Sequence, residues 1–156
     1  MIGYVILLFA VIGMDQYTKY LAYNHLRGGE PKLIIEKLLE FSYVENRGAA
    51  FGILQGKSWF FLIVTFLVCI ILTYYLVRYY DEMSILTKLC LILIMAGAIG
   101  NLIDRIARGF VVDFIFVRFW GYYDFPLFNV ADMAVVIGSI GLMLLILFSK
   151  EVKMEW

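Results

Sequence analysis

Four long apolar stretches constrain the fold of this chain more than any other feature of its sequence. They run approximately over Ile2–Ala22, Trp59–Tyr79, Ile85–Ile106 and Val130–Phe148. A helix needs about 20 mostly apolar residues to cross a bilayer, and each stretch is of that order. Because 63% of the residues are hydrophobic, 17% are charged and the mean hydropathy is +0.89, a soluble globular domain is strongly disfavoured.

Other features of the sequence further limit the class of protein to which the chain can belong. We expect one all-α integral membrane domain over residues 1–156, because the sequence shows no internal repeat, low-complexity tract or linker. The first apolar stretch has no basic segment before it and no cleavage site after it, so we expect a retained anchor. A net charge of zero gives no indication of nucleic-acid binding. Cys69 and Cys90 lie inside apolar runs without metal-ligand spacing and are interpreted as packing residues.

An even number of crossings places both termini on one side of the membrane and gathers the polar residues on the other. That second face receives the connections at residues 23–58 and 107–129. It carries Asn46, Arg47, Arg105, Asp113, Asp124 and Asn129. Asp104 and Asp132 are at the helix ends that open onto it, and Asp15 is in the later half of the first stretch, nearer that face. The positive-inside rule does not identify the cytoplasmic face, because the polar face has more Lys and Arg but the opposite segments are much shorter.

The two connections on the polar face have different compositions. After the turn sequence Gly28–Pro31, the apolar and β-branched residues of 32–45 predict short strands on the membrane surface, with a surface amphipathic helix as the alternative. The aromatic segment 116–125 is typical of an anchor in the headgroup layer. A lid that covers substrate is a second interpretation, and it is compatible with the first.

Asp113 and Asp132 are the strongest candidates for chemistry. Neither has a Lys or Arg within four positions, and an ionised acid at membrane depth is costly unless it has a function or a partner. Two carboxylates that share one proton can act as general base and general acid on a peptide bond. A proton-coupled transporter subunit and a non-catalytic membrane scaffold remain alternatives.

Other polar residues of the helices have structural interpretations. Asp15 and Lys19 are spaced i,i+4, as are Asp104 and Arg108, so each acid is expected to form a local ion pair. The small residues in Ala96-Gly97-Ala98-Ile99-Gly100 have the spacing that lets membrane helices approach closely. No His, Cys and carboxylate spacing indicates zinc.

Five segments, in this order, resemble motifs of the bacterial lipoprotein signal peptidase family (type II signal peptidase). They are Asp15-Gln16-Tyr17-Thr18-Lys19, Asn46-Arg47-Gly48-Ala49-Ala50-Phe51-Gly52, Gly97-Ala98-Ile99-Gly100-Asn101-Leu102-Ile103-Asp104-Arg105, Val111-Val112-Asp113-Phe114 and Phe128-Asn129-Val130-Ala131-Asp132. The resemblance extends from end to end. It departs at Ala96-Gly97, where a double glycine is common, and this affects no expected catalytic residue.

The resemblance implies an aspartic endopeptidase whose catalytic dyad is Asp113 and Asp132. Such an enzyme removes the signal peptide of a prolipoprotein just before a cysteine that carries diacylglycerol. The resemblance further implies that substrate is held or the site shaped by Asn46, Asn101, Arg105 and Asn129, with support from Asp15 and Asp104.

The resemblance also implies the setting of the enzyme. It predicts a multi-pass protein of the bacterial cell (inner) membrane with an extracytoplasmic active site and both termini cytoplasmic. It predicts four transmembrane helices, a small β-cradle in the first long connection and a short, mobile interfacial helix in the second. The expected partners are diacylglyceryl-prolipoproteins and membrane lipids. The expected state is a monomer with no metal or cofactor.

Overall fold

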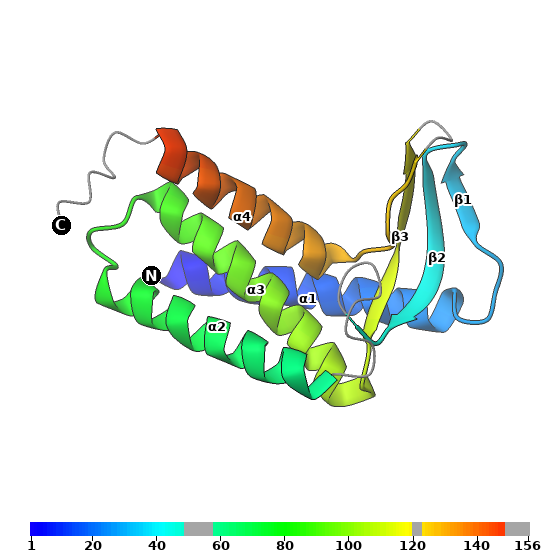
Figure 1. Ribbon diagram of the computed structural model, residues 1–156, viewed down its shortest axis with the longest axis horizontal. Coiled ribbons are helices and arrows are strands. Elements are labelled where there is room, and N and C mark those ends of the chain that lie inside the picture. Colours follow the sequence, from blue (N-terminus) through cyan, green and yellow to red (C-terminus); the bar gives the residue numbers. More distant parts are fainter. Residues whose placement is uncertain (49–57, 120–122, 149–156) are drawn as a thin grey trace.

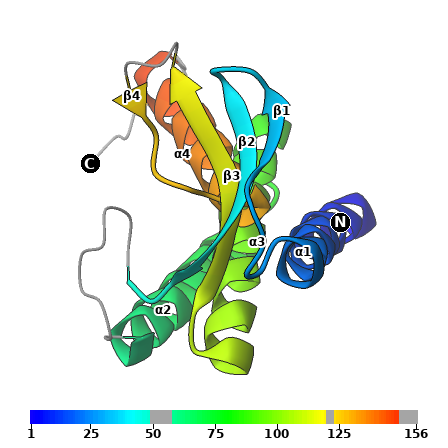
Figure 2. The same cartoon turned by 90° about the vertical axis from the view of Figure 1, so that its right-hand side faces the viewer.

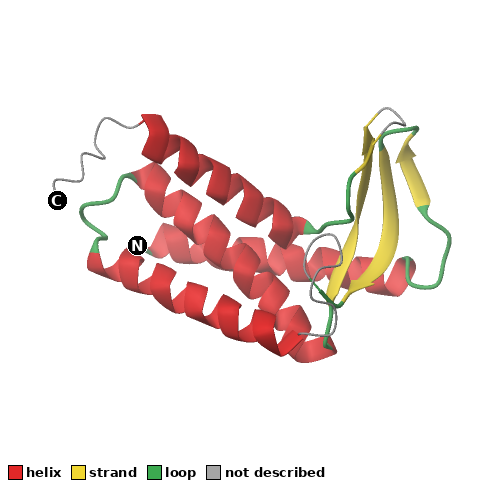
Figure 3. Ribbon diagram, viewed as in Figure 1, coloured by secondary structure: helices red, strands yellow, loops and turns green. Residues whose placement is uncertain are grey.

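The fold is a bundle of four helices with a small sheet at one end (Figures 1 and 3). The computed structural model describes residues 1–48, 58–119 and 123–148. Its helices are α1 (Ile2–His25), α2 (Ser58–Arg78), α3 (Ile85–Arg108) and α4 (Val130–Phe148). Among the described residues these are the four helices long and apolar enough to cross a membrane. Their bounds agree with the predicted stretches to within three residues.

The sheet is antiparallel and draws its strands from both connections of the polar face. The strands are β1 (Lys32–Ile35), β2 (Leu39–Asn46), β3 (Val111–Phe119) and β4 (Tyr123–Asp124), in the order β1-β2-β3-β4. Strands in the first connection were predicted and are confirmed, and the alternative of an amphipathic helix there is wrong.

The second connection differs from the expectation of an interfacial helix. Its described residues include β3 and β4 and contain no helix, and residues 120–122 lie outside the described part of the chain. Strand β3 forms because the mostly apolar run after Gly109 is rich in β-branched and aromatic residues and pairs with β2, for example Asp113 with Val44. A strand therefore carries the first candidate aspartate.

Glycines allow α3 to pack directly against α4, as the run of small residues predicted. A Cβ atom added to Gly97 would overlap the backbone carbonyl oxygen of Ala131 and lie 2.7 Å from a methyl group of Val135. A Cβ atom added to Gly138 would lie 2.7 Å from the carbonyl oxygen of Cys90. Because lipid is as apolar as the side chains, such close backbone contact is a main source of helix association in a membrane.

The bundle and the sheet meet where α1 and α3 end and α4 begins. Figure 2 views this junction from the sheet side. A cluster of buried apolar residues joins the end of α1 to β3 and the residue before it, namely Ala22, Leu26, Phe110, Val112 and Phe114. The start of α1 and the end of α4 lie at the opposite end of the bundle (Figure 1), as expected for an even number of crossings. The polar residues therefore gather at the junction.

Candidate active site

The two candidate aspartates line one cavity at the junction of bundle and sheet. Asp113 lies on β3 and Asp132 lies in the first turn of α4. The cavity, here called the junction cavity, has a volume of about 650 Å³. Its lining consists of Asn46, Gly48, Asn101, Arg105, Val111, Asp113, Phe125, Pro126, Leu127, Phe128, Asp132, Met133, Val135, Val136 and Ile137. The prediction that residues from separate motifs meet on one face is confirmed by this lining.

Two amide groups hold the carboxyl group of Asp113. The Nδ2 atom of Asn46 donates to Oδ2 at 2.8 Å, and the Nδ2 atom of Asn129 donates to Oδ1 at 2.7 Å. The backbone N–H of Gly48 donates to Asn46 Oδ1 at 3.0 Å and so fixes the orientation of that amide. Burial raises the pKa of Asp113 to about 6, and the charge of Asp132 raises it as well, against the effect of the two amide bonds. The Asp113 carboxyl group therefore keeps its proton at a higher pH than an ordinary aspartic acid.

Asp132 is held by a reciprocal pair of hydrogen bonds at the start of α4. Its own N–H donates to Asn129 Oδ1 at 2.9 Å, and the N–H of Asn129 donates to Asp132 Oδ2 at 3.1 Å. This is the pattern of a capping box, in which two free donors of the first helical turn are satisfied. The Nδ2 atom of Asn101 on α3 donates to the other oxygen, Oδ1, at 2.8 Å. Asn129 thus contacts both aspartates and sets their relative position.

Arg105 brings a positive charge to the cavity from α3. Its guanidinium donates to the carbonyl oxygens of Asn101 at 3.4 Å and Gly48 at 3.3 Å. Its Cζ atom lies 4.9 Å from the centre of the Phe61 ring on α2, within the range of a cation–π contact. The side chain is therefore held between α2, α3 and the end of β2, with its charge beside the two aspartates.

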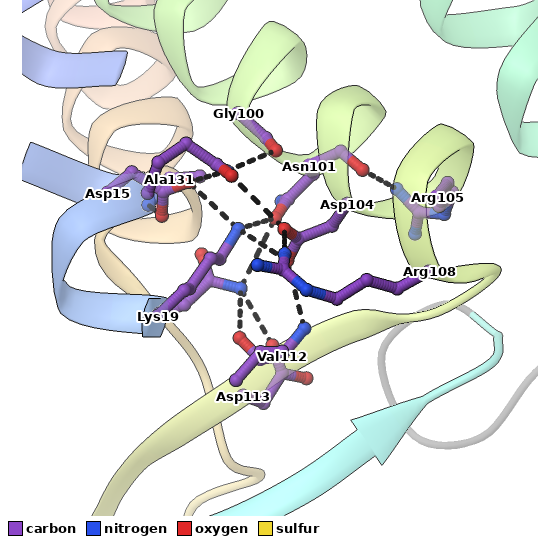
Figure 4. A network of polar contacts seen from close by, with 12 residues as sticks. Asp15, Lys19, Gly100, Asn101, Asp104, Arg105, Arg108, Val112, Asp113 and Ala131 are labelled. Atoms are coloured by element: carbon purple, nitrogen blue, oxygen red, sulfur yellow. Dashed lines mark hydrogen bonds and ion pairs between the residues drawn. The ribbon is translucent and has the colours of Figure 1, made fainter. Parts of the chain in front are cut away.

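Asp15 and Asp104 lie behind the cavity in one buried ionic network (Figure 4). Lys19 Nζ lies 2.9 Å from Asp15 Oδ2 and 3.2 Å from Asp104 Oδ2, and Asp104 Oδ1 pairs with Arg108. The predicted pairs Asp15–Lys19 and Asp104–Arg108 are both confirmed. The two pairs are joined through Lys19 into one network, because α1 crosses α3 at this level.

The same two acids tie the helices to the elements that carry the aspartates. Asp15 Oδ1 accepts from the N–H of Ala131 at 2.8 Å, so a residue of α1 caps the start of α4. Asp104 Oδ2 accepts from the N–H of Val112 at 3.0 Å, so α3 holds the strand residue next to Asp113. Asp15 and Asp104 therefore connect α1 and α3 to the two elements that carry Asp113 and Asp132.

Sequence reasoning did not assign a role to Gln16. Its Nε2 atom donates to the carbonyl oxygen of Gly100 at 3.0 Å and to Asp15 Oδ2 at 3.1 Å. The signal in the sequence was a short cluster of polar residues in a mostly apolar helix.

Asp124, which was predicted to lie on the same polar face, is not part of the buried ionic network. It pairs with Arg118 at 2.7 Å, from β4 to the neighbouring strand β3, and does not line the junction cavity.

The aromatic segment is divided between different surfaces. Phe125 lines the junction cavity, whereas Phe116 lines a separate small hollow beside β1 and β2. Trp120 and Tyr122, which were part of the predicted segment, lie outside the described residues.

Two carboxyl groups that line one cavity, at one end of a bundle of membrane-length helices, are the arrangement expected of a membrane aspartic peptidase. The sequence profile of the family described as signal peptidase (SPase) II matches residues 7–148, and the chain belongs to this family.

Similar proteins agree with that membership. The chain is 43% identical over 147 residues to a lipoprotein signal peptidase of Clostridium tetani, covering 94% of this chain and 92% of the relative. It is 41% identical over 155 residues to a lipoprotein signal peptidase of Bacillus velezensis, covering 99% of both. A solved bacterial membrane enzyme superposes with a TM-score of 0.88 at 35% identity, covering 100% of this chain and 94% of that enzyme.

Proposed function

We propose that this protein is a membrane aspartic endopeptidase that removes signal peptides from diacylglyceryl-modified prolipoproteins, cleaving just before the lipidated cysteine. The observation that carries the proposal is the pairing of Asp113 and Asp132 on one cavity, each held by donated hydrogen bonds. Membership of the signal peptidase II family supports the same reaction.

The proposed chemistry uses one proton shared by the two aspartates. The ionised carboxylate accepts a proton from water while the water oxygen bonds to the scissile carbonyl carbon, and the protonated partner donates to the carbonyl oxygen. When the intermediate collapses, the C–N bond breaks. The first carboxyl group protonates the leaving amine, and the second recovers its proton from the intermediate. The pair ends with one proton, as it began. The raised pKa of Asp113 supports retention of this proton up to about pH 6.

Arg105 and the amides of the cavity are proposed to hold the peptide. A peptide backbone presents carbonyl oxygens, and Arg105 lines the cavity with a guanidinium that carries five N–H donors. Asn46, Asn101 and Asn129 are proposed to act mainly on the aspartates, because their donors already contact carboxylate oxygens.

One wall of the cavity suits the acyl chains of the substrate. Val136 and Ile137 of α4 line the cavity, yet they are 54% and 57% exposed on the surface of the helix. The apolar wall therefore continues onto a helix face that lies against lipid in a membrane. A diacylglyceryl group could stay in the lipid while the attached peptide reaches Asp132, one turn nearer the helix start. Each buried methylene of a lipid chain contributes about 0.8 kcal/mol to binding.

The proposed orientation places the sheet and the cavity on the extracytoplasmic side and both termini in the cytoplasm. This orientation is the one that the family resemblance implies, and the distribution of Lys and Arg leaves it open.

The test is cleavage of a lipidated prolipoprotein by the purified protein in detergent. Asp113→Asn and Asp132→Asn should each lower kcat by about a thousandfold or more, because an amide can neither accept the proton of water nor share one. Asp124→Asn is the matched control, because this acid is exposed and does not line the cavity. It should keep the turnover of the parent. Near-parental turnover of either dyad variant, purified free of parent enzyme, would overturn the assignment.

A further inference from the structure

The ammonium group of Lys19 is buried, and each of its three N–H donors has an acceptor. The Lys19 side chain has no exposed surface, and its Nζ atom lies 2.9 Å from Asp15 Oδ2 and 3.2 Å from Asp104 Oδ2. It also donates to Asn101 Oδ1 at 2.8 Å. An ammonium group has three donors and no acceptor, so these three oxygens use its whole capacity.

The contact with Lys19 decides which way the amide of Asn101 points. The two ends of an amide have almost the same shape, and their neighbours determine which end is oxygen. Because an ammonium group only donates, the oxygen of Asn101 must face Lys19. The Nδ2 atom of Asn129 also donates to this oxygen, at 3.2 Å. If the amide of Asn101 were reversed, its NH2 group would face two other donors, Lys19 Nζ and Asn129 Nδ2.

The orientation of Asn101 in turn fixes a donor on the dyad. With its oxygen turned to Lys19, the NH2 group of Asn101 faces Asp132 and donates to Oδ1 at 2.8 Å. A continuous path of donated hydrogen bonds therefore runs from Lys19 on α1, through Asn101 on α3, to Asp132 on α4. Lys19 thus acts on the hydrogen bonding of Asp132 through the amide of Asn101.

We infer that Lys19 is a positioning residue for the proposed reaction: it locks the amide of Asn101 with its donor toward Asp132 and holds a positive charge behind the dyad. This inference rests on the proposed function. It gives Lys19 a second role beyond neutralising Asp15 and Asp104. An apolar residue of similar length could fill the same space but could not set the direction of the amide.

Within residues 1–48, 58–119 and 123–148, the charged groups around the dyad come from four elements. They are Asp15 and Lys19 on α1, Asp104, Arg105 and Arg108 on α3, Asp113 on β3 and Asp132 on α4. Burial and the charge of Asp132 raise the pKa of Asp113, and the charge of Lys19 acts in the opposite direction. Loss of the Lys19 charge should therefore move the acidic limb of the pH–rate profile to higher pH.

The test replaces Lys19 in an Asp15→Asn background, so that one acid and one base are removed together. The Asp15→Asn side chain retains an oxygen that could still accept from the N–H of Ala131, and Asp104 keeps Arg108 and the N–H of Val112. Asp15→Asn/Lys19→Met removes both the charge and the donor to Asn101. Asp15→Asn/Lys19→Gln removes the charge but keeps an amide donor. Each is compared with Asp15→Asn alone for kcat, KM, pH profile and Tm in detergent.

We expect the Met variant to lose about tenfold or more in kcat, with KM close to that of Asp15→Asn and a lower Tm, because Asp104 loses a charged partner. The Gln variant should recover part of that kcat. In both variants the acidic limb should lie at higher pH by about half a unit or more, since one nearby charge is gone. Equal kcat and equal pH profiles in all three proteins would overturn the inference and leave Lys19 a purely structural role.

Should the Met variant not fold, the Gln variant decides the matter by its pH profile. An acidic limb unchanged from that of Asp15→Asn would overturn the inference. Failure of the proposed function would look different, since the parent enzyme would then not cleave the lipidated substrate or Asp113→Asn would remain active.

Discussion

The substitution Gly100→Ala lies outside the junction cavity, yet it should displace the Asp15 carboxylate that caps the start of α4. Gly100 lies on α3 where Asp15 of α1 and the start of α4 meet it. An added Cβ atom would lie 2.6 Å from Asp15 Oδ2 and 3.2 Å from the Cβ atom of Ala131. Ordinary contacts begin at 3.4 Å, so the Asp15 carboxylate must withdraw by about 0.8 Å.

The size of the effect follows from what Asp15 holds. A withdrawal of about 0.8 Å directed along the bond to the Ala131 N–H would stretch it from 2.8 Å to about 3.6 Å, beyond hydrogen-bond range. Loss of a hydrogen bond to a charged group costs about 1.5–3 kcal/mol, while alanine is about 1 kcal/mol better than glycine in a helix. We therefore expect the free energy of unfolding to fall by about 0.5–2 kcal/mol, with a loss of turnover as the first turn of α4 shifts.

The assay is thermal unfolding in detergent, in parallel with cleavage of a lipidated prolipoprotein. Gly13→Ala is the matched control, because Gly13 is exposed on α1 and an added Cβ atom there meets no atom of the described residues within 4 Å. Its Tm should equal or exceed that of the parent. A Tm of Gly100→Ala as high as that of Gly13→Ala would show that α1 and α3 separate without cost, and the reasoning from close packing would fail.

Three further predictions concern pH, the buried acids and the substrate. The folded-state pKa of Asp113, about 6, lies above its ordinary value of 3.8, so the folded protein binds more protons between these values. Protonated Asp113 therefore contributes fully to stability below about pH 4, and this contribution declines by up to about 3 kcal/mol as pH rises past 6. When Tm is measured from pH 4 to 8, it should fall less in Asp113→Asn than in the parent protein. Asp104→Asn should lower the free energy of unfolding by about 3 kcal/mol, because Lys19 loses one of its charged partners. Unchanged thermal stability with complete loss of activity would instead place Asp104 in the catalytic machinery. A prolipoprotein without lipid should be cleaved far more slowly than its lipidated form, and the double variant Val136→Ser/Ile137→Ser should narrow that difference in kcat/KM. Equal specificity constants for the two substrates in the parent enzyme would show that the cavity recognises peptide alone.

The helices and the local ion pairs could be predicted from sequence because their causes are local. Bilayer thickness sets the length of an apolar helix, and the i,i+4 spacing brings Asp15 to Lys19 on one helix face. The contact of Lys19 with Asp104 could not be predicted, because it depends on where α1 crosses α3. For the same reason, the Arg118–Asp124 pair was missed, since the two residues meet only after the chain reverses between β3 and β4.

Strand β3 was missed for a different reason. The run Val111–Val117 is almost entirely apolar and follows a membrane helix, so hydrophobic periodicity does not distinguish a buried strand from an irregular connection. Pairing with β2 decides between them, and β2 lies more than 60 residues earlier in the chain. The role of Asn129 was likewise implied only by resemblance, because its contacts to both aspartates require β3 and α4 to be in place.

The position of Asp132 in the first turn of α4 fixes the depth of its carboxylate in the bilayer. A rise of about 1.5 Å per residue puts this carboxylate only a few ångströms below the start of a helix about 28 Å long. The hydrogen bond from Asn129 to Asp113 attaches that start to the sheet, and the bond from Ala131 to Asp15 attaches it to α1, so the depth cannot vary independently of the rest of the bundle. A peptide bond would then be selected by its height along the bilayer normal as well as by its sequence. Bilayer thickness would thereby become a determinant of which bond is cut, since a thinner or thicker membrane would bring a different bond of the same substrate to that level.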